Sequence, residues 1–172
     1  MRGRPTPHLP QLPLARVRFC EEASLAANTE LLIGDPDGSH VLIRPVARRH
    51  PGLFDHRDAN RIACECRIAA GAFRGEVQAD LRSEEFSAFL DALRVLQQAP
   101  GEAAALTPEE GRLVVSLLSL GGEGRVRVSG EAIDEDNRLQ FAFEIDAGAL
   151  GAICESLERT LAVFPVVAAP EV

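Results

Sequence analysis

The feature that most constrains the fold of this chain is a strict alternation of apolar and polar residues in several segments. In residues 61–70 (RIACECRIAA), Ile62, Cys64, Cys66 and Ile68 share one side of an extended chain, and charged residues occupy the other. The same alternation recurs in three further segments, residues 73–81, 125–133 and 138–146. Such segments are typical of strands that are buried on one face only, so we expect a mostly antiparallel β-sheet.

The predicted inward faces of these segments are apolar. In residues 73–81 the inward residues are Phe73, Val77, Ala79 and Leu81, and in residues 138–146 they are Leu139, Phe141, Phe143 and Ile145. Residues 30–46 read as two more strands around the turn Asp35-Pro36-Asp37-Gly38. Residues 112–120 (RLVVSLLSL) are apolar on both sides, which fits either a central strand or a buried helix. The glycines that follow predict a tight hairpin.

Two segments with apolar residues three and four positions apart predict amphipathic helices. The first follows Ser83, its expected N-cap, and ends at Pro100, whereas the second follows Asp146. Their apolar stripes are Phe86, Phe89, Leu90, Leu93 and Leu96, and Leu150, Ile153, Cys154, Leu157 and Leu161. Packing both stripes on one face of the sheet gives a two-layer α+β sandwich.

The second strand–helix unit repeats the first at an offset of 64 residues, with Leu81 matching Ile145 and Phe86 matching Leu150. This offset suggests a pseudo-twofold repeat. The alternative is that any strand followed by a well-patterned helix would align in this way. Outside this body, we expect residues 1–16 to be a flexible Pro/Arg-rich tail, residues 17–165 a single α+β domain, and residues 166–172 a flexible C-terminal tail.

The charge of the chain restricts its partners. The formal net charge is −8, and since the first 20 residues contain four arginines and no acid, the remaining residues carry −12. An acidic body favours a basic protein partner and disfavours nucleic acid. No apolar run reaches the roughly 20 residues that a membrane-spanning helix needs, so no membrane is expected. Because we find no secretory signal, we expect a cytoplasmic protein with reduced thiols.

The residue types that carry metal or nucleophile chemistry form no defined signature. Cys64 and Cys66 have the spacing of neighbours on one strand face, and a zinc site needs a second pair that is absent. Cys154 lies on a helix stripe, where a free cysteine behaves as a small hydrophobe. A metal-dependent enzyme would have to use three residues of a polar segment, His50, His56 and Asp58. We favour a surface loop there, and expect no enzyme, no catalytic residue, no metal and no cofactor.

Two acidic segments are the expected partner-binding surfaces. Residues 134–136 read as an acidic hairpin tip, because the run is too short for a calcium loop. Residues 55–60 read as a polar loop that leads into a strand. The expected partner-binding residues are Asp55, Asp58, Asn60, Asp134, Glu135 and Asp136.

The order of these segments resembles the WapI-type immunity protein family. In that family an Asp-x-Asn-Trp-Leu stretch precedes a strand pair and a helix, and Asp58, Asn60, Arg61 and Ile62 occupy the corresponding positions here. The segment GRVRVSG (residues 124–130) is similar to the family's closing strand pattern, and Asp146 matches an aspartate that precedes the last helix. The likeness spans about residues 30 to 163, with Arg61 in place of the tryptophan and Ala147-Gly148 in place of a glutamine stretch.

The resemblance implies a small cytosolic protein without enzymatic activity that neutralises a toxin domain, often a nuclease, by binding it. An acidic body fits a basic toxin domain. The alternative is an adaptor or structural subunit of a larger bacterial complex, in which the N-terminal arginines Arg2, Arg4, Arg16 and Arg18 would grip another component.

Overall fold

Two antiparallel four-stranded sheets and two long helices make up the computed structural model, which describes residues 29–51, 56–99, 101–121 and 124–167. The first sheet has the order β1 (Leu31–Gly34), β2 (His40–Arg48), β3 (Arg61–Ala70) and β4 (Phe73–Arg82). The second has the order β5 (Ala103–Leu106), β6 (Leu113–Ser119), β7 (Arg125–Asp134) and β8 (Asn137–Asp146). The helices are α2 (His56–Ala59), α3 (Ser83–Gln98), the 3-10 turn η1 (Ala147–Ala149) and α4 (Leu150–Val163).

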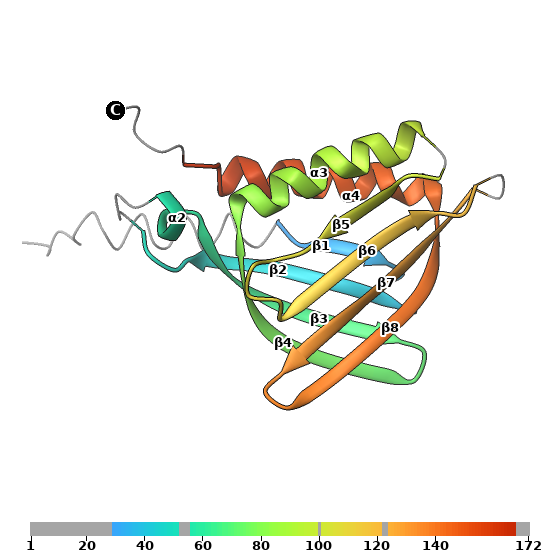
Figure 1. Cartoon of the computed structure of the whole chain (residues 1–172), viewed down its shortest axis with the longest axis horizontal. Coiled ribbons are helices and arrows are strands. Elements are labelled where there is room, and N and C mark those ends of the chain that lie inside the picture. Colours follow the sequence, from blue (N-terminus) through green and yellow to red (C-terminus); the bar gives the residue numbers. More distant parts are fainter. Residues whose placement is uncertain (1–28, 52–55, 100, 122–123, 168–172) are drawn as a thin grey trace, which may run out of the picture.

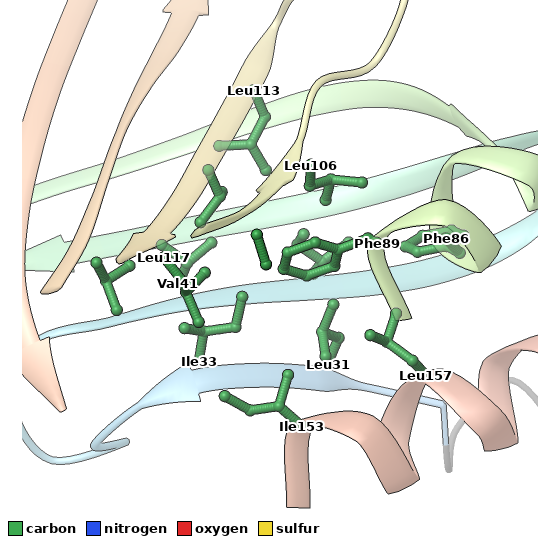
Figure 2. Close-up of a cluster of buried hydrophobic side chains, with 14 of the residues drawn as sticks. Leu31, Ile33, Val41, Phe86, Phe89, Leu106, Leu113, Leu117, Ile153 and Leu157 are labelled. Carbon is green, nitrogen blue, oxygen red and sulfur yellow. The ribbon is translucent and has the colours of Figure 1, made fainter. Parts of the chain in front are cut away.

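The two sheets cross each other, and α3 and α4 lie side by side along one side of them (Figure 1). α3 packs against β5, and α4 packs against β1. One continuous core joins both sheets and both helices. Figure 2 shows part of it, with Leu31, Ile33, Val41, Phe86, Phe89, Leu106, Leu113, Leu117, Ile153 and Leu157 labelled. Each large side chain buried here contributes about 1.5–3 kcal/mol, so the helix stripes hold the two sheets together.

The predicted α+β architecture is confirmed, and the sheet proves to be two sheets. The internal repeat is visible in the element bounds, because β7 and β8 begin and end 64 residues after β3 and β4. Each half of the chain therefore places four strands before a long helix. Residues 113–119 form a strand, which settles the choice between a central strand and a buried helix.

Two local predictions need correction, and one strand was not predicted. Ser83 is the first residue of α3 and Arg82 is its N-cap, because β4 runs directly into the helix and leaves Ser83 fully buried. The Glu85 carboxylate accepts the Arg82 N–H at 2.8 Å, whereas the Ser83 hydroxyl has no partner among the described residues. The predicted polar loop contains the short helix α2. The strand β5 was not predicted, since four residues (AAAL) carry too little pattern.

Candidate partner-binding surface

The predicted acidic hairpin tip is the two-residue turn between β7 and β8. Asp134 pairs with Asn137 at the end of the ladder, and Glu135 and Asp136 form the turn. Glu135 has a φ of 51°, a left-handed conformation that an L-residue adopts at a cost. All three acidic side chains are exposed. The turn therefore presents its carboxylates away from the body of the protein.

Only one of these carboxylates is neutralised within the described part of the chain. Arg112 Nη1 lies 3.7 Å from Asp134 Oδ1. No described residue forms an ion pair with Glu135 or Asp136. Two adjacent carboxylates without an internal ion pair can attract a basic group, and such charges raise the rate of encounter with an oppositely charged surface.

A cleft of about 280 Å³ lies beside this turn, between β4 and the β7–β8 hairpin. It is lined in part by Val77 and Leu139, and at its rim by Arg74, Glu76 and Asp134. The Arg74 guanidinium donates to the backbone oxygens of Gly71 at 2.7 Å and Phe73 at 2.9 Å, so it stabilises its own hairpin. The cleft thus combines apolar lining residues with a rim that carries both signs of charge, since Arg138 also lines it.

Phe73, at the start of β4, is 68% exposed although it lies on the inward side of its strand. The alternation of residues 73–81 predicted a buried position for it, and that prediction is wrong at this residue. The reason is that Phe73 lies at the tip of the β3–β4 hairpin, which extends past β8 in Figure 1. No sequence pattern could reveal this, because exposure here depends on where the other sheet ends.

The second predicted surface is only partly a surface. Asp55 lies outside the described residues, and Asp58 is half-buried in α2. Asn60 is 0% exposed, so it cannot offer its side chain to a partner. Its amide instead donates to Glu84 and to the Val167 oxygen (3.0 Å), and its oxygen accepts the Val167 N–H at 2.7 Å. Figure 1 shows α2 well away from the β7–β8 turn.

Asn60 and Arg48 together fix the chain that follows α4. Arg48 donates to the backbone oxygens of Pro165, at 2.6 Å, and of Ala59. Val167 is therefore bonded to the body of the protein, although the predicted C-terminal tail begins at residue 166. The rest of that tail, residues 168–172, and the predicted N-terminal tail, residues 1–16, lie outside the described residues.

A second charged cleft, of about 230 Å³, is neutralised internally. Asp80 accepts from Arg49 at 2.7 Å, and Arg61 lies 3.5 Å from Glu110. Arg82 pairs with Glu109, whose N–H donates to Glu85 at 2.9 Å. These contacts connect the loop before β6 to α3 and β4. Each surface ion pair of this kind contributes only about 0–1 kcal/mol to the stability of the protein. The cluster has a structural role and leaves little net charge for a partner.

The cysteines of the described residues are buried thiols. Cys64 and Cys66 lie in the core and Cys154 on the α4 stripe, as the pattern predicted. Burial raises the pKa of Cys66 to about 12. The pKa of Cys64 is also raised, mainly by burial and to a smaller extent by the nearby charge of Cys66. A thiol is a nucleophile only as its thiolate, so these groups are inert at neutral pH.

Metal ligands are not clustered in the part of the chain that the structure describes: no three His, Cys, Asp or Glu side chains there could hold one ion. His50 is exposed, and the side chain of His56 lies outside the description. Among the described helices, none combines the length and the apolar character needed to cross a membrane.

Comparison with known proteins identifies the family. The model of the immunity protein WapI-like family matches residues 31–165, from β1 to the residues that follow α4, and the chain belongs to this family. No curated protein matches the chain.

Three solved structures are similar to this chain at a low level. The MRP1/MRP2 structure from Trypanosoma bruciei is 12% identical, covering 90% of this chain and 95% of that one, with a TM-score of 0.47. The CdiA-CT/CdiI toxin and immunity complex from Enterobacter cloacae is 12% identical, covering 75% and 97%, with a TM-score of 0.38. The plant transcriptional regulator PBF-2 is 9% identical, covering 78% and 81%, with a TM-score of 0.46. Likeness at this level carries no functional conclusion.

Proposed function

We propose that this protein is a cytoplasmic, non-catalytic immunity protein that binds a toxin domain and neutralises it by occlusion. The observation that carries the proposal is the family match, which spans residues 31–165 and so includes both sheets and both long helices. A protein that occludes its partner needs a rigid, well-packed body, and the single continuous core supplies one.

The charge distribution supports a basic toxin domain as the partner. The chain carries a net charge of −8, and the β7–β8 turn adds the unpaired carboxylates of Glu135 and Asp136. Nuclease domains present basic surfaces to bind nucleic acid, so an acidic partner can cover such a surface. We propose the β7–β8 turn, with the adjacent cleft, as the centre of this binding surface, and Asp58 as a more distant contact.

The proposal is tested by capturing the partner and then measuring neutralisation. The tagged protein is purified from its native lysate, and the co-eluting proteins are identified by mass spectrometry. The expected result is one basic domain at equal stoichiometry, whose toxicity on expression is relieved when this chain is co-expressed. A stable multi-subunit assembly without toxicity would support the alternative role as an adaptor or structural subunit.

A further inference from the structure

β8 forms one edge of the second sheet. β8 is the last strand of its sheet and is ten residues long, and within the described residues no strand pairs with its other side. Two of the other edge strands are covered, because α3 packs against β5 and α4 packs against β1. An uncovered edge of this length offers a row of hydrogen-bonding groups to an added strand.

The pairing of β7 and β8 shows which groups point outward. Asp134 and Asn137 close a two-residue hairpin, so the odd-numbered residues of β8 exchange hydrogen bonds with β7. Ala147 extends this pattern, since its N–H donates to the Gly124 oxygen at 2.8 Å. The outward N–H and C=O groups therefore belong to the even-numbered residues, which include Arg138, Gln140, Ala142 and Glu144.

The usual protections of a free edge are weak along β8. The register with β7 is continuous and contains no bulge, and the strand contains no proline. Two of its three charged even-numbered residues form ion pairs with β7, since Arg138 lies 3.2 Å from Glu131 and Glu144 lies 3.1 Å from Arg125. The third, Asp146, accepts the Gly148 N–H at 2.7 Å. The backbone of the edge is accessible between them.

Phe73 is close in sequence to the point where β4 approaches β8. β4 packs against β7, and Val77 and Gly75 of β4 line the same cleft as Leu139 of β8. The contact at Gly75 is close, because a Cβ there would lie 3.1 Å from Leu139 Cδ2. Phe73 precedes Gly75 by two residues on the same face of β4, roughly 7 Å nearer the β3–β4 turn. Its ring is 68% exposed and is therefore available to a strand added beside β8.

A single extended segment fits this position better than a second copy of the chain. A second copy paired through its own β8 would have to place its first sheet on the side where the β3–β4 hairpin already extends past β8 (Figure 1). A lone strand needs only the width of one chain. The unpaired carboxylates of Glu135 and Asp136, at the start of β8, favour a basic residue on that strand.

We propose that the free edge of β8 and the ring of Phe73 form a docking site for an extended, basic segment of the partner protein. The segment adds to the second sheet as a ninth strand, places an apolar side chain on Phe73, and places a lysine or arginine at Glu135 and Asp136. This inference rests on the proposed function, because it specifies how the toxin domain is held. It is an instance of strand addition, in which main-chain hydrogen bonds supply affinity and alternate side chains supply specificity.

The test uses a fluorescein-labelled peptide of about ten residues, in which lysine or threonine alternates with valine around one central phenylalanine. We expect saturable binding by fluorescence anisotropy, with slower hydrogen exchange at the amides of Arg138, Gln140, Ala142 and Glu144. Ala142→Pro removes one outward N–H without breaking a bond to β7, and we expect it to weaken binding about tenfold or more. Phe73→Ser should weaken binding about tenfold by removing the apolar contact.

Ala142→Ser, which keeps the backbone N–H, is the matched control and should bind like the original protein. A peptide of the same sequence with methylated backbone nitrogens on its pairing side should not bind. The proposal is overturned if the unmodified peptide fails to bind, or if the methylated peptide binds equally well. If Ala142→Pro fails to fold, Phe73→Ser and the methylated peptide still decide the question. If the protein neutralises its toxin but does not bind the peptide, the proposed function stands and the β8 docking site is wrong.

Discussion

The ring of Phe141 lies directly over Gly130 on the neighbouring strand. A Cβ atom at residue 130 would lie 2.5 Å from Phe141 Cζ and 2.2 Å from the Val114 oxygen. Real Cβ atoms do not approach other atoms so closely, so the glycine leaves room for both the ring and the backbone of β6. This contact keeps Phe141 buried at the centre of β8, the strand on which the proposed docking site depends.

Gly130→Ala is expected to destabilise the protein by about 2–3 kcal/mol, because the added methyl group forces the ring or β6 to move. The measurement is the free energy of unfolding from urea denaturation. Ser129→Ala, on the opposite face of the same strand, is the control and should change stability by about 0.5 kcal/mol or less. Equal stability of the two variants would show that the sheet adapts without strain.

Asn60→Ala is expected to lower the free energy of unfolding by about 1–3 kcal/mol, because it removes the hydrogen bonds that Asn60 makes with the Val167 N–H and the Glu84 carboxylate. The loss should be accompanied by faster amide exchange at Val167. Asp58→Ala, in the short helix α2 that precedes Asn60, is the control and should leave Val167 protected. If the exchange rate of Val167 stays unchanged in Asn60→Ala, the residue does not hold the C-terminal segment.

Stability is expected to fall as the pH rises above about 9. The folded pKa of Cys66 is raised from 9.0 to about 12, and those of Cys64 and Cys154 are raised too. Between pH 9 and about 12 the thiols of the unfolded chain lose protons that the folded chain keeps. Each fully buried thiol therefore lowers the free energy of unfolding by up to about 1.4 kcal/mol per pH unit. The chain contains no lysine and no tyrosine, so cysteines dominate the titration there. The comparison is the slope of unfolding free energy against pH for the original protein and Cys66→Ala, and an identical slope would contradict the prediction.

Reversing the charge of Asp134, Glu135 and Asp136 to lysine is expected to slow association with the captured toxin domain about tenfold at low salt and to weaken the salt dependence. Stopped-flow mixing at several ionic strengths measures both. A matched control reverses three exposed acids elsewhere, Glu30, Glu102 and Glu155, which changes the net charge by the same amount. If both triple variants slow association equally, the effect comes from net charge and the turn has no special role.

Much of the fold could be predicted because its signals are local. Alternation placed β3, β4, β7 and β8 correctly, since a strand with one buried face must alternate. The helix stripe of α3 was also correct, and its residues Phe86, Phe89, Leu90, Leu93 and Leu96 are all buried. The acidic turn was predicted correctly because a short run of acidic residues between two alternating segments is typical of a hairpin turn.

The remaining features depended on contacts between distant residues. Asn60 looked like a loop residue, and only its position opposite Glu84 and Val167 makes it a buried anchor. Phe73 looked like a core residue, and only the end of the second sheet at β8 leaves it exposed. The sequence by itself determined most of the long strands and both long helices, because hydrogen bonding and side-chain period act over a few neighbours. The tertiary structure alone decided that the strands divide into two crossing sheets, and therefore which edge and which side chains remain uncovered, because that depends on where one sheet ends over the other.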